Sequence, residues 1–431
     1  MVTFFLRNGI YACAALFSLA ACQSCEKPKP ACVTLDGNLA WHGTNRDKLD
    51  QMMQSRGICS EGYDAAKKPV AVFDWDNTVV KNDVGDATFF YMLAHDKVLQ
   101  PENKNWRLTS RFLQADAVTA LDTACGSLAA AGAPLPTSTN VACQKEILTI
   151  YTDGKTTTGK TAFAGFDYRR MEPAYAWLTQ LFAGYTKAQV QEFTNAAKKE
   201  NLSNPIDQMQ TIGGTQVVHW VRVYDQIKDL IAKLQQNGFD VWIMSASPQP
   251  VVEVWASEVG VSTDHVVGIR QVEANSKYTY NLQGCGDVPD GTNNGAGQAT
   301  GNSLITYIDG KRCWTNKVIF GQTGASALSK TADEKQRQAF AAGDSDTDIT
   351  FMQDATALKL AINRNKKEIM CNAYANAGGK WIVNPMFIQP KAQQKTPYPC
   401  STTGCKDAAG ASVPCKDENG QVIQDQADTV F

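Results

Sequence analysis

The chain has few histidines and no excess of charge of either sign. Its 431 residues include only 4 histidines, and 41 basic residues stand against 43 acidic ones, which gives a formal net charge of −2. This balance provides no electrostatic basis for binding nucleic acid or an anionic membrane surface. Because the histidines are scattered, zinc is also a poor explanation for the 13 cysteines. With 43% hydrophobic and 19% charged residues, the composition predicts a globular protein, and the length favours two or three domains.

Long apolar runs are missing too, and the one near the N-terminus has the pattern of an export signal. Arg7 is the only charged residue before the apolar residues 10–17, a run too short to span a bilayer and typical of a signal-peptide core. It leads into Leu-Ala-Ala-Cys at residues 19–22, which resembles a bacterial lipobox. We expect residues 1–22 to be a lipoprotein signal peptide. Plain cleavage that leaves Cys22 as a thiol is the alternative.

Lipid on Cys22 would be the only attachment of the mature chain to a membrane. Gln23 follows this cysteine, and not the aspartate that retains lipoproteins at the inner membrane. We therefore expect an exported protein, either at the periplasmic face of the outer membrane or secreted.

The other cysteines support export. Several lie as loosely spaced pairs in stretches rich in Gly, Pro and Asn, which is typical of disulfides in an oxidising compartment. The sequence does not fix their connectivity, but proximity suggests a set of pairs. These are Cys32 with Cys59, Cys125 with Cys143, Cys285 with Cys313, and two among Cys400, Cys405 and Cys415.

Short apolar runs alternate with amphipathic stretches in much of the chain. Residues 69–73 and 240–244 are typical of buried parallel strands, and weaker runs occur at 338–342 and 358–362. The stretch 223–234 carries its apolar side chains on one helical face. This alternation predicts an α/β fold with a mostly parallel sheet.

The first two strands are separated by a long interval with helical patterns and no repeated strand signal. An insertion of this kind in a βα connection is most simply a separate helical subdomain. Residues 278–282 and 304–308 flank a Gly/Asn-rich loop and predict a β-hairpin insertion. The expected division is a tether and N-terminal segment at 23–67, core at 68–90, helical cap at 91–215, core at 216–390 with a hairpin insertion at 276–312, and a cysteine-bearing polar tail with little to bury at 391–431.

The strongest chemical signal is Asp-Trp-Asp-Asn-Thr at residues 74–78, directly after the first strand. Asp74 and Asp76 would emerge together at the carboxyl end of that strand, where open α/β sheets bind their ligands. One carboxylate can attack phosphorus while its neighbour passes a proton to the leaving oxygen. A lone Asp-x-Asp is more often a solvated turn, but here a strand precedes it and Asn-Thr follows.

This segment resembles the Asp-x-Asp-x-Thr signature of the haloacid dehalogenase-like hydrolases, and two later segments match that family in order. Ser245 ends the second strand, and Gly-Asp-Ser-Asp-Thr-Asp at residues 343–348 fits the pattern Gly-Asp-x-x-x-Asp. The resemblance implies a Rossmann-like core with an inserted cap. A calcium loop is excluded because the ligand series and terminal Glu of an EF-hand are missing.

The resemblance also implies an activity, that of a magnesium-dependent phosphomonoesterase with an aspartyl-phosphate intermediate. Asp74 would be the nucleophile, Asp76 the general acid and base, and Ser245 a hydrogen-bond donor to the phosphoryl group. Mg²⁺ would be held by the Asp74 side chain, the Asp76 carbonyl and Asp344, with Asp348 in support. Thr78 is expected on the substrate side.

Such a site further requires a lysine that neutralises charge on the phosphoryl oxygens. The candidates are Lys311, Lys317, Lys330 and Lys335, for each of which a surface position is the default. Lys317 opens the apolar residues 318–320, as the family lysine opens a helix before the acidic motif. We therefore expect Lys317 at the site, although its distance from Gly343 along the chain is longer than usual.

The position of the cap between the first two motifs resembles that in phosphoserine phosphatase-like members, and segments near 220–222 and 244–248 look like exported bacterial phosphorylcholine phosphatases. Asp83 lies nine residues after Asp74, at the offset where these enzymes place an acidic residue facing a substrate ammonium group. A solvated loop aspartate is the alternative. We expect a small phosphate ester as substrate, such as phosphorylcholine or a similar amino-alcohol phosphate. A phosphotransferase, and a non-catalytic envelope lipoprotein that keeps the fold as a binding module, remain alternatives.

Overall fold

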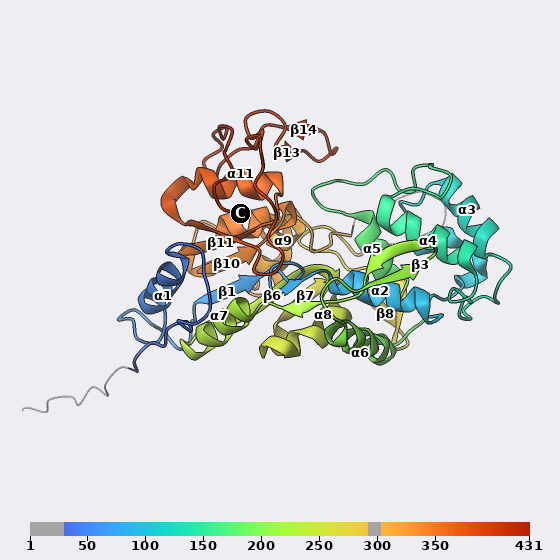
Figure 1. Ribbon diagram of the computed structural model, residues 1–431, viewed down its shortest axis with the longest axis horizontal. Coiled ribbons are helices and arrows are strands. Elements are labelled where there is room, and N and C mark those ends of the chain that lie inside the picture. The colour runs from blue at the N-terminus through green and yellow to red at the C-terminus, as the bar shows by residue number, and fades with distance from the viewer. Residues whose placement is uncertain (1–29, 292–302) are drawn as a thin grey trace, which may run out of the picture.

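The computed structural model describes residues 30–291 and 303–431 (Figure 1). The predicted signal peptide, the expected lipid site at Cys22 and the first part of the tether lie outside these residues. Within the described ranges, no helix combines the length and the apolar character that crossing a membrane requires.

Six parallel strands form the central sheet in the order β12-β11-β10-β1-β6-β7. They include the four runs predicted as strands, which are confirmed as β1, β6, β10 and β11. The strands are β1 (Val70–Phe73), β6 (Asp240–Pro248), β7 (Val266–Ile269), β10 (Phe340–Gly343), β11 (Leu358–Asn363) and β12 (Trp381–Pro385). Because β1 lies between β6 and β10, the carboxyl ends of these three strands meet at one edge of the sheet.

Helices cover both faces of this sheet, so its strands are apolar on both sides. Successive residues of β1 point to opposite faces: Ala71 and Phe73 join one hydrophobic cluster, Val70 and Val72 the other. The first cluster includes α7 (Asp225–Gln236) and α8 (Gln249–Ala256). The second includes α9 (Asp309–Val318), α10 (Ile349–Asp354) and α11 (Lys367–Ala375) (Figure 1).

An inserted, mainly helical unit stands beside the core, at the right of Figure 1. The chain enters and leaves it through the antiparallel pair β2 (Val80–Lys81) and β5 (Arg222–Val223). Its elements are α2 (Val84–Ala94), α3 (Ala115–Cys125), α4 (Val141–Asp153), α5 (Pro173–Gln180), α6 (Lys187–Ser203) and a hairpin of β3 (Met209–Ile212) and β4 (Thr215–Val218). The first cap helix therefore begins at Val84, inside the segment that the sequence assigned to the core.

The β-hairpin insertion has a different pairing from the one predicted. β9 (Lys277–Leu282) pairs with β8 (Gln271–Ala274) and not with residues 304–308. The turn between them uses Asn275 and Ser276 at positive φ, as tight hairpins require. Residues 304–308 form no strand; four of their apolar side chains are buried against the sheet and lead into α9. A short apolar run does not reveal whether it is paired or only buried.

The C-terminal residues are better buried than predicted. Tyr398 and Ile423 join the core cluster on the α11 side, and the short pair β13 (Cys405–Lys406) and β14 (Ser412–Val413) continues this layer. The polar composition was misleading because disulfides stabilise small, loop-rich segments that have few apolar residues. At the other end of the chain, α1 (Asn45–Arg56) packs against the core through Leu49 and Met53.

Five disulfides join the ten cysteines of the described ranges. Three of them have the predicted connectivity. A pair among the last three cysteines was also predicted, and it is Cys405–Cys415. Cys400 pairs with Cys371, to which the sequence gave no partner. The five are Cys32–Cys59, Cys125–Cys143, Cys285–Cys313, Cys371–Cys400 and Cys405–Cys415.

Because every described cysteine is paired, we expect the oxidised protein lacking residues 1–29 to show no free thiol, even when unfolded in urea. Reduction should lower its melting temperature, since a native disulfide contributes about 2–5 kcal/mol in small domains. Thiol titration in urea and thermal melts with and without reductant check both statements. Eight or more titratable thiols without reductant would contradict the connectivity.

Candidate active site

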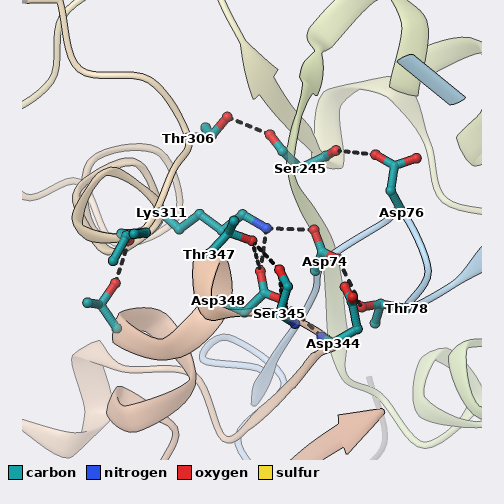
Figure 2. A network of polar contacts seen from close by, with 12 residues as sticks. Asp74, Asp76, Thr78, Ser245, Thr306, Lys311, Asp344, Ser345, Thr347 and Asp348 are labelled. Carbon is teal, nitrogen blue, oxygen red and sulfur yellow. Dashed lines mark hydrogen bonds and ion pairs between the residues drawn. The ribbon is translucent and has the colours of Figure 1, made fainter. Parts of the chain in front are cut away.

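Three buried carboxylates from two segments of the chain meet at the carboxyl edge of the sheet. Asp74 follows β1, and Asp344 and Asp348 follow the adjacent strand β10; each offers an oxygen atom within 4.8 Å of the other two. Figure 2 shows these side chains converging below the end of β6. The strand order therefore places together residues that are about 270 positions apart along the chain.

A buried lysine stands between two of these carboxylates. The ammonium of Lys311 lies 2.5 Å from Asp74 Oδ1 and 2.6 Å from Asp348 Oδ1, and its side chain is fully buried (Figure 2). Burial alone would lower the pKa of Lys311, but the charges of Asp348 and Asp74 outweigh it and raise this pKa. The lysine is therefore fixed in its charged form.

Local backbone geometry directs this lysine. Ile308, the residue before α9, has φ +43°, which is strained for a β-branched residue. A side-chain carbon on Gly310 would lie 1.7 Å from the carbonyl oxygen of Ile305, so only glycine fits there. The chain thus folds back tightly just before Lys311, and the first turn of α9 carries the ammonium to the strand ends.

The lysine expected from the sequence, Lys317, does not reach this cluster. Its ammonium donates to the carbonyl oxygen of Gly284 and lies 4.6 Å from the ring centre of Trp314. Lys330 forms an ion pair with Glu418. The prediction of Lys317 was wrong because it assumed a helix beginning at residue 317, whereas α9 begins at Asp309 and has Lys317 near its end.

Asp348 shapes the acidic loop. Its Oδ2 accepts hydrogen bonds from the backbone N–H groups of Asp344 and Ser345, both at 3.0 Å. A side-chain carbon on Gly343 would lie 2.6 Å from Asp348 Cβ, so a glycine is required at this turn. Asp348 therefore holds the loop that presents Asp344.

Thr78 has a role that differs from the predicted contact with substrate. Asn77 has φ +62°, which Asn tolerates better than most residues, and this turn brings Thr78 back towards the strand end. The buried Thr78 hydroxyl lies 2.9 Å from Asp74 Oδ2 and 3.2 Å from Asp344 Oδ1. It bridges the two carboxylates behind the cavity and orients Asp74.

The second aspartate of the motif lies beside two serines. Asp76 Oδ1 accepts from the Val84 backbone N–H at 2.7 Å, and Oδ2 accepts from Ser247 Oγ at 2.7 Å. The Ser245 hydroxyl lies 3.4 Å from the same oxygen and is fully buried (Figure 2). Pro248 is the residue before α8 and provides no side-chain cap, so the Ser247 hydroxyl is not used to cap this helix. Ser247 therefore joins Ser245 at the site.

A cavity of about 270 Å³ opens from this cluster towards the cap. Asp83 lines it, and its carboxylate also caps α2 by accepting from the Asp86 backbone N–H at 2.9 Å. Asp86 Oδ1 in turn accepts from the hydroxyl of Tyr151 at 2.7 Å. The sequence missed several further cavity residues, which are Asp86, Tyr151, Tyr175, Trp220, Ser247 and Arg364. Most of them come from the cap, for which no motif was available.

Burial shifts the acidic groups of the site. It raises the pKa of Asp74 to about 6, with Lys311 opposing this and the charge of Asp344 adding to it. Burial, then the charges of Asp83 and Asp74, raise the pKa of Asp76. Burial and next the charge of Asp83 raise the pKa of Asp86 to about 8. Carboxylates crowded in this way favour protonation or a nearby cation.

The donor set fits a hard divalent cation. Asp74, Asp344 and Asp348 offer carboxylate oxygens within reach of one ion, and their charge exceeds that of Lys311. Asp348 already uses both of its oxygens, for Lys311 and for the loop N–H groups. The oxygens of Asp74 also accept, from Lys311 and Thr78, and those of Asp344 accept from Thr78 and Arg364, so these contacts do not rank the three carboxylates as ligands.

Comparison with known proteins agrees with this arrangement. Residues 149–300 match the family model described as haloacid dehalogenase-like hydrolase. This range contains Ser245, while Asp74 and Asp344 lie outside it. No curated protein matches the chain by sequence.

One solved structure shares the fold at low sequence identity, and others show a weaker similarity. A conserved functionally unknown protein from Anaerococcus prevotii has a TM-score of 0.56 and 18% identity, over 81% of this chain and 94% of that one. A protein with unknown function from Bordetella pertussis has a TM-score of 0.42 and 13% identity, over 74% and 100%. A phosphoserine phosphatase, as an analogue of its phospho-aspartyl intermediate, has a TM-score of 0.32 and 14% identity, over 74% and 92%. The matched segment, the parallel sheet and the order of the site residues are all consistent with the haloacid dehalogenase-like hydrolase family that residues 149–300 match.

Loss of the buried ammonium should destabilise the fold. We expect Lys311→Met, which keeps the apolar stem, to lower the free energy of unfolding by about 3–5 kcal/mol because two buried carboxylates lose their partner. Lys317→Met, the matched control from the same helix, should change it by less than about 1 kcal/mol. Urea unfolding at neutral pH measures both values, and equal effects would refute the structural role given to Lys311.

Proposed function

We propose that this protein is a magnesium-dependent phosphomonoesterase that works through an aspartyl phosphate on Asp74. One observation carries the proposal: Asp74 is buried at a strand end with one oxygen on Lys311 and the other on the Thr78 hydroxyl. A carboxylate held from both sides keeps one orientation towards the cavity, which is what an in-line nucleophile requires.

The residues divide the reaction into two steps. In the first, an Asp74 oxygen forms a bond to phosphorus while the bond from phosphorus to the alcohol oxygen breaks, and Asp76 donates a proton to that oxygen. In the second, Asp76 removes a proton from water, the water oxygen bonds to phosphorus, and the Asp74 carboxylate is released. The raised pKa of Asp76 suits it to hold the proton before the first step.

Mg²⁺, held by Asp74, the Asp76 carbonyl and Asp344, would shield negative charge on the phosphoryl oxygens. Lys311 supplies positive charge beside Asp74 and neutralises part of the negative charge of Asp74 and Asp348. The Ser245 and Ser247 hydroxyls both donate to Asp76 and so hold it in place at the cavity.

A non-catalytic binding module is the weaker alternative. Within the described residues, the cluster of Asp74, Asp76, Asp344 and Asp348, of which only Asp76 is partly exposed, has one lysine and one arginine, Arg364, as its ion-pair partners. Mutual repulsion of such carboxylates lowers stability when no cation joins them. A scaffold would gain nothing from this arrangement, whereas a phosphoryl-transfer site depends on it.

Substitution of the two aspartates should separate the steps. Asp74→Asn keeps the side-chain volume and should abolish hydrolysis of an aryl phosphate in the presence of Mg²⁺. Asp76→Asn should slow breakdown of the intermediate, so that radioactive phosphate remains on the acid-quenched protein. Circular dichroism controls for folding. Activity of Asp74→Asn within tenfold of the unchanged chain would remove Asp74 from the nucleophile's role.

The substrate we favour is a small amino-alcohol phosphate such as phosphorylcholine or phosphoethanolamine. Asp83 and Asp86 both line the cavity, as do the aromatic residues Tyr151 and Trp220, and the Tyr151 hydroxyl donates to Asp86. Two neighbouring carboxylates with aromatic rings are suited to an ammonium group. Of the aromatic residues in α2, only Phe90 lines the cavity, while Tyr91 stacks on His95 outside it.

Because the pKa of Asp86 is raised, we expect the preference of the enzyme for this substrate to depend on pH. Near pH 7 the Asp86 carboxyl is mostly protonated, and a cation binds its ionised form better. The kcat/KM for phosphorylcholine, divided by that for an aryl phosphate, should therefore rise by up to about tenfold between pH 7 and 9. Asp86→Asn should abolish this rise. A ratio that is flat in the unchanged chain would refute ammonium recognition by Asp86.

Export to an oxidising compartment, with lipid at Cys22 or in soluble form, belongs to the same proposal. The five disulfides support it, because such bonds persist outside the reducing cytosol.

A further inference from the structure

Arg364 is the one cationic side chain among the described residues that line the cavity. It follows β11, the strand next to β10, so the strand order brings it to the same edge as the acidic loop. Its side chain is 26% exposed, and Nη1 lies 2.5 Å from Asp344 Oδ2. The motifs of the sequence assigned no role to this residue.

The contact with Asp344 uses only a part of what a guanidinium offers. Arginine carries five N–H donors in a planar fork that suits carboxylate and phosphate groups. Among the described residues, Asp344 alone accepts a hydrogen bond from Arg364. This bond fixes the position of the guanidinium and leaves other donors for a ligand in the cavity.

The guanidinium reaches from the acidic cluster towards the cap. Burial would lower its pKa, but the charge of Asp344, followed by those of Tyr175 and Asp83, raises it. Tyr175 and Asp83 both line the cap side of the cavity. Arg364 therefore lines the same cavity as these two residues, while Lys311 lies behind Asp74 and is not among the lining residues.

We propose that Arg364 binds a second anionic group of the substrate, a carboxylate or a further phosphate on its alcohol part. The proposal rests on the phosphomonoesterase function given above, and it favours an ester with a further anion over phosphorylcholine and phosphoethanolamine, which carry none. A cavity lined by the acidic Asp83 and Asp86 and by the cationic Arg364 fits an alcohol that carries both a cation and an anion. The volume of about 270 Å³ limits this alcohol to a compact one.

Two pairs of esters test for the anionic group and distinguish its source. O-phosphoserine and phosphoethanolamine differ by one carboxylate; ethylene glycol bisphosphate and ethylene glycol monophosphate differ by one phosphate. In the pair whose additional group is the one that Arg364 binds (the matching pair), the unchanged chain should have the higher kcat/KM for the more anionic ester. Arg364→Gln should reduce that preference at least about tenfold, and Arg364→Lys by less. Effects that come from the lost Asp344 contact act on both members of a pair and cancel in the ratio.

Lys367→Gln is the matched control, because it removes an exposed cation from the same segment outside the cavity. Its ratios should equal those of the unchanged chain. If Arg364→Gln lowers the kcat/KM values of all four esters equally, Arg364 contacts the phosphoryl group or only Asp344, and the proposal is overturned. The same holds if the unchanged chain prefers the less anionic ester in both pairs.

Binding gives a readout that does not depend on turnover. Calorimetry on the Asp74→Asn protein with Mg²⁺ should show tighter binding of the more anionic ester of the matching pair. Adding Arg364→Gln should remove this difference. If the unchanged chain hydrolyses none of these esters and no aryl phosphate, the phosphomonoesterase function fails, whereas the binding difference still decides the role of Arg364. Equal binding in both proteins would overturn the role of Arg364 even if hydrolysis is found.

Discussion

The ammonium of Lys311 holds together two carboxylates that would otherwise repel each other. Asp74 and Asp348 lie within 2.6 Å of it, and all three side chains are buried. Three such groups are favourable in the interior only as a set, because removal of one leaves an uncompensated charge in a poorly solvated place. The segment that delivers the lysine accordingly contains a strained Ile308 and a glycine for which no other residue fits. Local strain of this kind persists where surrounding contacts determine the geometry.

The same constraint explains how much of the site could be read from the sequence. Asp74, Asp76 and Asp344 each follow a buried strand, and Ser245 lies inside β6, which extends to Pro248 beyond the predicted end. A local apolar pattern located these residues, and parallel order implied that they meet. Lys311 has no strand of its own and depends on the start of α9, which sequence patterns place poorly. The six-strand core was therefore predictable, while the lysine was assigned six residues too late.

Other features were hidden because they depend on contacts between distant segments. The cavity wall combines Tyr151 from α4 with Asp86 from α2, and no periodicity within either helix indicates this hydrogen bond. The C-terminal residues are buried through Cys371–Cys400, a pair in which one cysteine lies in a helix and the other in a polar stretch. Composition detects apolar burial, but it does not detect burial that is maintained by a covalent link.

The cap and the tail meet the core near the start of the helix that carries Lys311. The Asp309 backbone N–H donates to the carbonyl oxygen of Arg169 at 3.0 Å, and the Arg169 guanidinium pairs with Asp309 and Glu368. Arg169 Nη1 also donates to the carbonyl oxygen of Lys406 at 3.0 Å, within the hairpin closed by Cys405–Cys415. Cap, core and tail thus fix the first turn of α9 together. Because the position of Lys311 depends on three segments so far apart, the buried ammonium follows from the completed fold and from no single stretch of the sequence.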